Sequence, residues 1–141
     1  MTIDSGLLLV NLRAAGLLLA VLVVVNLFVP SRFGWRADMA KLTLINRQIF
    51  QAHSVFLVLI LALSSALLLT SADALLEPSR LSRAILLGLT IFWGLRMLMQ
   101  WFFYSPDTWR GNRFFTTMHV VFSATWIYMT AVFGTALWRV S

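Results

Sequence analysis

The sequence has no cysteine and few charged residues, and each shortage excludes a group of functions. Of its 141 residues 11% are charged, whereas 60% are hydrophobic and the mean hydropathy is +0.87. Without cysteine the chain forms no disulfide, thiolate nucleophile or cysteine-ligated zinc or iron–sulfur site. A soluble domain carries about 25% charged residues, and a core of this size cannot bury so much apolar surface. The composition predicts an integral membrane protein and excludes a soluble enzyme, a coiled coil and a disordered chain.

Carboxylates are also scarce, and none lies in a long apolar run. The five are Asp4, Asp38, Asp73, Glu77 and Asp107. A carboxylate-centred proton or cation exchanger would therefore have no acid inside the membrane. The chain also has no nucleophile-elbow sequence, no Gly-rich phosphate loop and too few histidines for a His-rich di-iron oxidase. Conventional catalysis has little support, and the sequence identifies no catalytic residue while leaving open whether the protein is an enzyme.

Four apolar runs are each long enough to cross the ~30 Å hydrocarbon core, which takes about 20 helical residues. They are Leu7–Val29, Ile49–Thr70, Ala84–Phe103 and Phe114–Trp138. We expect Pro30 to close the first run and Asn112 to cap the fourth. The first run lacks the basic flank and the cleavage site of a signal peptide, so we expect a retained helix. The expected fold is one all-α membrane domain over residues 1–141, a four-transmembrane-helix up-down bundle.

The loop after the first run predicts a short helix on the membrane surface. Met39, Leu42 and Ile45 recur at helical spacing after Asp38, which is a suitable N-cap. Trp35 just upstream is a natural interface anchor. We expect an amphipathic interfacial helix over about residues 38–46 that runs into the second span.

The net charge of +6 comes from 11 Lys and Arg against five Asp and Glu. The basic residues lie mostly in short loops, where the positive-inside rule and anionic lipid headgroups explain them, so we expect no nucleic-acid partner. Six lie in the loops after the first and third runs: Arg32, Arg36, Lys41, Arg47, Arg110 and Arg113. The opposite side has four: Arg13, Arg80, Arg83 and Arg139. This bias predicts both termini outside the cytoplasm, in a membrane of the bacterial inner-membrane type.

Three ionisable residues inside the spans come near one membrane face. His53 and His119 follow the starts of the second and fourth helices, and Arg96 precedes the end of the third. Gln100 follows Arg96 by four residues and shares its helix face. A single histidine near a helix end is more often bonded to a backbone carbonyl than to a ligand. We nevertheless predict that His53, Arg96, Gln100 and His119 converge in one cytoplasm-side cavity, because polar groups in hydrocarbon must find partners.

The fourth helix carries a stripe of less apolar residues at spacings of three and four. Its members are Thr116, His119, Ser123, Trp126 and Thr130. Such a stripe is typical of a helix face turned toward other helices, and it serves packing more often than ligand binding. We expect homo-oligomerisation or membership of a larger membrane complex as well, with Gly88, Gly94 and Gly134 as points of close approach.

Three functions fit these residues. The first is a binding or assembly subunit of a larger membrane complex, whose arginine-rich face contacts anionic headgroups. The second is a redox protein in which His53 and His119 ligate a b-type haem. The third is a small transporter or lipid-modifying enzyme in which Arg96 and Gln100 hold an anionic headgroup. The sequence alone leaves all three open, with the first preferred.

Overall fold

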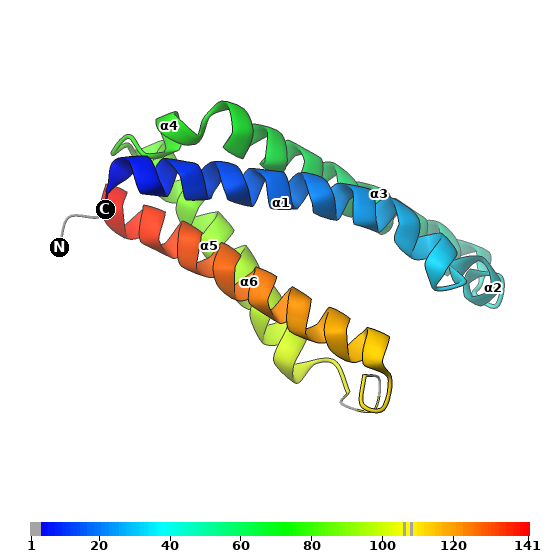
Figure 1. Cartoon of the computed structure of the whole chain (residues 1–141). Coiled ribbons are helices and arrows are strands. Elements are labelled where there is room, and N and C mark those ends of the chain that lie inside the picture. Colours follow the sequence, from blue (N-terminus) through cyan, green and yellow to red (C-terminus); the bar gives the residue numbers. More distant parts are fainter. Residues whose placement is uncertain (1–3, 106, 108) are drawn as a thin grey trace. The chain divides into compact units, whose positions relative to one another are not determined.

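The computed structural model describes residues 4–105, 107 and 109–141. In that part of the chain the regular secondary structure is helical, with loops between the helices (Figure 1). Its helices are α1 (Ser5–Arg32), α2 (Trp35–Met39), α3 (Leu44–Thr70), α4 (Ala72–Leu75), α5 (Arg80–Phe102) and α6 (Arg113–Val140). The helices α1, α3, α5 and α6 are long and apolar enough to cross a membrane. The predicted all-α class, with four candidate spans and a short helix after the first, is confirmed. The chain is an integral membrane protein.

The chain divides into two compact units. The first contains the start of α1 up to Leu12 together with residues 73–141, and so carries α5 and α6. The second contains Arg13–Ala72, and so carries the rest of α1 with α2 and α3. The bundle order of the spans, the single domain over 1–141 and the orientation in the membrane stay predictions.

In the second unit α1 does not end at Pro30, and that part of the prediction is wrong. The helix continues to Arg32, and the Phe33 amide still donates to the Val29 carbonyl at 3.0 Å. Proline lacks an N–H, but in the last turn of a helix its loss costs a single backbone bond. Gly34 follows with φ of 64°, a left-handed conformation that glycine adopts without strain. The chain therefore leaves the helical path at this glycine.

The short helix forms, but it starts three residues earlier than predicted and ends at Met39 instead of near residue 46. It covers Trp35–Met39, and its N-cap is Gly34 instead of Asp38. Asp38 lies inside α2 and accepts a hydrogen bond from the Lys41 ammonium at 3.0 Å. Thr43 is extended, with ψ of 154°, and so separates α2 from α3. The periodic residues after position 43 consequently belong to the span helix α3, which begins at Leu44.

Close packing joins α1 to α3 within the second unit. The Ser65 hydroxyl donates to the Gly16 carbonyl at 2.8 Å, and both residues are buried. A Cβ atom at Gly16 would lie 3.0 Å from the Leu68 Cβ and 3.1 Å from the Leu69 Cγ. In a membrane, where burial of apolar surface does not drive helix association, small residues allow this close approach. At Gly16, therefore, α1 packs so closely on α3 that a Cβ atom would force a neighbouring side chain to shift.

In the first unit α5 and α6 pack side by side (Figure 1). The predicted cap of α6 is confirmed, because the Asn112 Oδ1 accepts from the Phe114 amide at 3.0 Å. Gly94 and Gly134 lie at the contact between the two helices, where an added Cβ at each would meet a threonine methyl at 3.8 Å. This is an ordinary van der Waals distance, so the packing of α5 on α6 would accept a Cβ atom at both positions. Homo-oligomerisation stays a prediction.

The start of α1 is fixed to α6 by polar contacts. The Tyr128 hydroxyl donates to the Asn11 Oδ1 at 3.0 Å, and the Arg139 guanidinium contacts the Ser5 hydroxyl. At the same end the Arg83 Nε donates to the Val140 carbonyl at 2.7 Å. These bonds tie the start of α1 and the start of α5 to the second half of α6.

We predict that Gly16→Val destabilises the protein by about 1–3 kcal/mol more than Gly88→Val does. Both glycines are helical, so the change in helix propensity is the same, but a Cβ at Gly88 meets nothing within 4 Å. The measurement is the free energy of unfolding in detergent micelles, with mild denaturant. Equal values for the two variants would show that α1 and α3 do not pack at Gly16.

Candidate functional site

Four polar side chains from α5 and α6 meet around the amide of Gln100, which is only 6% exposed. The Gln100 Oε1 accepts from the Trp126 Nε1 at 3.3 Å and from the Arg96 Nη1 at 3.5 Å. The Gln100 Nε2 lies 3.0 Å from the His119 Nδ1. We call Arg96, Gln100, His119 and Trp126 the Gln100 cluster. The two α5 members are one turn apart, and the two α6 members are two turns apart on the face toward α5.

The partners of Gln100 fix the direction of every bond in the cluster. An indole N–H and a guanidinium only donate hydrogen bonds, so the amide atom facing Trp126 and Arg96 must be the oxygen. The amide nitrogen then faces His119 and donates to its Nδ1. A neutral His119 that accepts at Nδ1 carries its proton on Nε2. The cluster therefore selects one tautomer of His119.

Aromatic rings surround the charged member of the cluster. The Arg96 Cζ lies 4.9 Å from the centroid of the Trp126 ring and 5.9 Å from that of Tyr104. Trp126 in turn stacks on Trp93, with centroids 5.1 Å apart. A cation over a tryptophan face gains about 0.5–2 kcal/mol, more when water is excluded. The rings thus offset part of the cost of holding Arg96 in a membrane-spanning helix.

The loop between α5 and α6 covers the histidine. The Trp109 indole stacks on the His119 ring, with centroids 4.5 Å apart and planes inclined by 11°. The Trp109 Nε1 is itself buried and has no hydrogen-bond partner among the described residues. Trp109 therefore shields one face of the His119 ring. The polar contact of His119 with Gln100 is made through the edge of the ring.

Arg96 keeps unused hydrogen-bonding capacity. A guanidinium has five N–H donors, and the structure gives Arg96 one hydrogen bond, at the long distance of 3.5 Å. Among the residues that the structure describes, the single ion pair joins Lys41 and Asp38, so Arg96 has no acidic partner there. The side chain is half-buried, so part of it is accessible to a ligand.

Three of the four residues predicted to converge are brought together: Arg96, Gln100 and His119. His53 lies on α3, in the other unit, where its Nδ1 is 2.8 Å from the Ile49 carbonyl. That contact makes the Nδ1 of His53 the donor and leaves its Nε2 unprotonated in the neutral ring. A cavity shared by all four residues, and its place on the cytoplasmic side, stay predictions.

The haem hypothesis can be compared with these tautomers. A histidine that ligates iron through Nε2 usually donates its Nδ1–H to the protein, as His53 does. His119 has the opposite arrangement, since its Nδ1 accepts from Gln100. For His119 to ligate iron through Nε2 and donate from Nδ1, the Gln100 amide would have to turn over. Its own N–H groups would then face the N–H donors of Trp126 and Arg96. Within the described residues, no group of three His, Asp or Glu side chains is arranged to hold a metal ion.

The stripe in the sequence predicts which face of α6 packs against other helices, but it does not predict that Trp126 contacts Gln100 and Arg96. Ser123, another member of the predicted stripe, accepts from the Trp101 Nε1 of α5 at 3.3 Å, so the stripe does face α5. Trp126, a stripe member seven residues after His119, is the second donor to Gln100 and the ring under Arg96. The i, i+7 spacing from His119 was the available signal.

No protein-family model, curated protein or solved structure matches this chain. The class that fold and composition define is a small integral membrane protein with four candidate spans. Any more specific role has to be argued from the Gln100 cluster and from the other features of this chain.

We predict that Gln100→Leu lowers the free energy of unfolding by about 1–3 kcal/mol, because it leaves the buried Trp126 indole N–H, and one N–H of the half-buried Arg96, without this acceptor. Gln51→Leu is the matched control, since Gln51 is exposed on α3 and should change stability by less than about 0.5 kcal/mol. Denaturant titration in micelles measures both. Equal losses for the two variants would contradict a structural role for the Gln100 amide.

Proposed function

We propose that this membrane protein binds an anionic group, a carboxylate or a phosphate, at Arg96. One observation carries the proposal: the guanidinium lies in a membrane-spanning helix with one long hydrogen bond and no acidic partner among the described residues. The proposal combines the binding role preferred from the sequence with the anion recognition considered there for Arg96 and Gln100.

The position of Arg96 along α5 makes an unpaired charge costly. Arg96 precedes the end of α5 at Phe102 by six residues, which is about 9 Å at 1.5 Å per residue. An arginine at the bilayer centre costs on the order of 2.5–3.5 kcal/mol on insertion scales, and less toward the interface. Contact with the Trp126 ring recovers about 0.5–2 kcal/mol. An anion that accepts from the remaining donors supplies the rest and adds affinity.

The arrangement around Arg96 suits a planar or tetrahedral oxyanion. The Arg96 Cζ lies over the Trp126 ring at 4.9 Å from its centroid, and the N–H donors of a guanidinium lie along the edges of its plane. A carboxylate or phosphate binds those edges through two parallel hydrogen bonds. The Gln100 Oε1 accepts from the Nη1 at 3.5 Å, and together with the Trp126 ring this contact limits the positions open to the guanidinium. Arg96 is thus prepared for binding before the ligand arrives, which lowers the entropy cost.

Three sources offer this chemistry: a soluble anion, a lipid headgroup, and an acidic side chain of a second membrane protein. The first would make the protein a small transporter or receptor, the second a lipid-binding protein, and the third an assembly subunit. All three rest on the same contact at Arg96, so a test of that contact comes first.

We predict that Arg96→Gln weakens binding of an anionic amphiphile at least ten-fold, because charge-assisted hydrogen bonds contribute about 1.5–3 kcal/mol. The probes are inorganic phosphate, octyl phosphate and phosphatidylglycerol, each titrated in a neutral detergent. The readout is the rise in melting temperature, since a ligand that binds only the folded state stabilises it. Response to all three probes indicates a soluble anion, and response to the two amphiphiles alone indicates a lipid.

Two variants control this experiment. Arg113→Gln removes the same charge from the first residue of α6, outside the Gln100 cluster, and should leave the response unchanged. Arg96→Lys keeps the charge but loses the flat, two-donor edge, so an intermediate response is expected. If Arg96→Gln responds to every probe as the wild type does, Arg96 is not an anion site and the proposal is wrong.

A further inference from the structure

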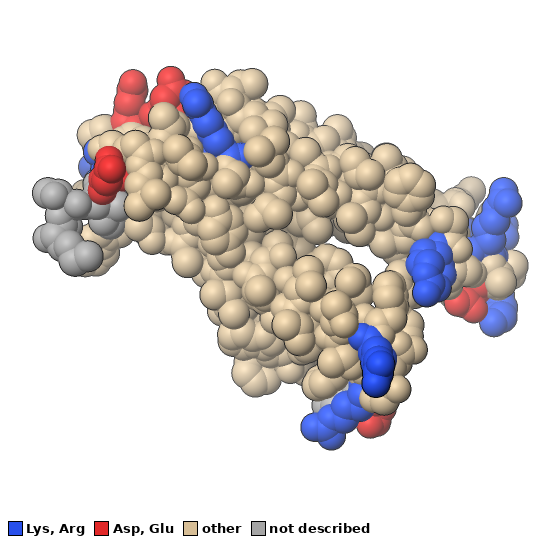
Figure 2. All heavy atoms as spheres, in the orientation of Figure 1, with Lys and Arg blue, Asp and Glu red and all other residues tan. Residues whose placement is uncertain are grey.

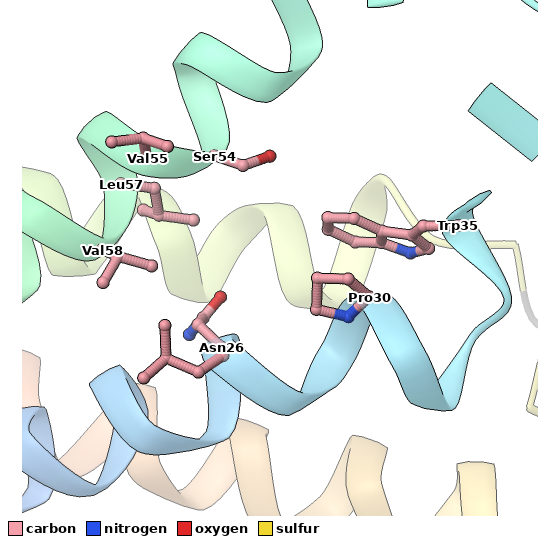
Figure 3. Close-up of a pocket in the computed structure, with 8 residues that line it drawn as sticks. Asn26, Pro30, Trp35, Ser54, Val55, Leu57 and Val58 are labelled. Carbon is pink, nitrogen blue, oxygen red and sulfur yellow. The ribbon is translucent and has the colours of Figure 1, made fainter. Parts of the chain in front are cut away.

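The second unit contains an apolar groove between α1, α2 and α3, of about 310 Å³ (Figure 3). Its walls include Leu27 and Pro30 of α1, the Trp35 indole of α2, and Val55 and Leu57 of α3. Small-molecule pockets have volumes of about 300–1,000 Å³, so this groove is at the lower end of that range. It has room for one slender ligand segment and not for a whole lipid.

The two polar side chains of the groove leave it apolar in character. The Asn26 Nδ2 donates to the Leu22 carbonyl at 2.8 Å, and the Ser54 hydroxyl donates to the Phe50 carbonyl at 2.9 Å. Both side chains therefore use these donors in hydrogen bonds to backbone carbonyls of their own helices. No ionisable side chain lines the groove. A hydrocarbon segment fits these walls better than a polar ligand does.

The groove lies at the depth of the lipid chains. Asn26 precedes the end of α1 by six residues and Ser54 follows the start of α3 by ten, which places them about 9 Å and 15 Å along their helices. Trp35 closes the end nearer the membrane surface, and its ring is held edge-on against Phe50 with centroids 4.9 Å apart. A chain in the groove would leave it beside this tryptophan.

Basic residues gather just beyond that end. The segment from residue 32 to residue 47 carries Arg32, Arg36, Lys41 and Arg47 against Asp38 alone, a net charge of +3. The exposed ion pair of Lys41 with Asp38 neutralises one of these charges. Arg36 and Arg47 have no acidic partner among the described residues, and Figure 2 shows basic side chains at this end of α1 and α2. Positive charge next to an apolar groove is complementary to an anionic lipid.

We propose that the groove holds one acyl chain of an anionic phospholipid whose headgroup lies against this basic segment. The chain fills the space between α1 and α3, and Trp35 lies at the level where chain and headgroup meet. The inference uses residues of the second unit only. It is independent of anion binding at Arg96.

The test is photolabelling in nanodiscs with phosphatidylglycerol that carries a diazirine near the end of one acyl chain. We expect adducts to concentrate on the peptides that contain residues 26–35 and 54–58. Leu57→Trp fills the groove and should remove most of this labelling, and Val55→Trp, on the same wall, is a second blocking variant. Leu59→Trp is the matched control, because Leu59 is as exposed as Leu57 (47% and 44%) but does not line the groove.

The headgroup contact is tested with the same label on phosphatidylcholine and with Arg36→Gln. One basic residue near a lipid surface contributes about 1 kcal/mol, so Arg36→Gln should reduce groove labelling by phosphatidylglycerol about five-fold. Phosphatidylcholine should label the groove less than phosphatidylglycerol does. Equal labelling by both lipids would contradict the preference for an anionic headgroup. The groove itself would be excluded as a site if adducts were spread evenly over the lipid-facing residues, or if both blocking variants left the labelling unchanged.

Discussion

Hydrocarbon offers no hydrogen bonds, so each polar side chain in a span needs a partner within the protein or a ligand. In this chain the Gln100 amide is a hydrogen-bond partner of three residues. Its oxygen accepts from Trp126 and Arg96, and its nitrogen donates to His119. The amide therefore joins α5 to α6 and fixes the rotation of both helices. Because amides in a low dielectric bond strongly and are costly to leave unpaired, this connection sets which residues face the Arg96 guanidinium.

The same requirement explains the packing elsewhere in each unit. Ser65 donates across to the Gly16 carbonyl, and Tyr128 donates to Asn11 near the start of α1. Each bond joins a side chain of one helix to a polar group of another, where small residues or short side chains let the backbones approach. Arg96 is the exception, because the described residues leave most of its donors open. That exception is the physical basis for placing a ligand there.

The all-α class and the four candidate spans could be predicted from hydropathy and run length, since the thickness of the bilayer sets the length of a span. The register of α2 could not, because Gly34 and the extended Thr43, not the apolar period, decide where that helix begins and ends. Arg96 and Gln100 were predicted as one face from their spacing. The stripe on α6 placed Trp126 on the face turned toward other helices, but the spacing within one helix does not tell which residue of α5 lies opposite its indole.

Gln100 directs the hydrogen bonds of the cluster, and we propose that this arrangement leaves Arg96 ready for an anion. Solid-state ¹⁵N NMR of the histidine ring in bilayers tests it most directly, because the two ring nitrogens give separate signals according to which carries hydrogen. With His53→Gln as the background, His119 is the one histidine left. The structure predicts a neutral ring with the proton on Nε2 and a bare, accepting Nδ1. A proton on Nδ1 would mean that the amide faces the other way, which would contradict the whole arrangement around Arg96.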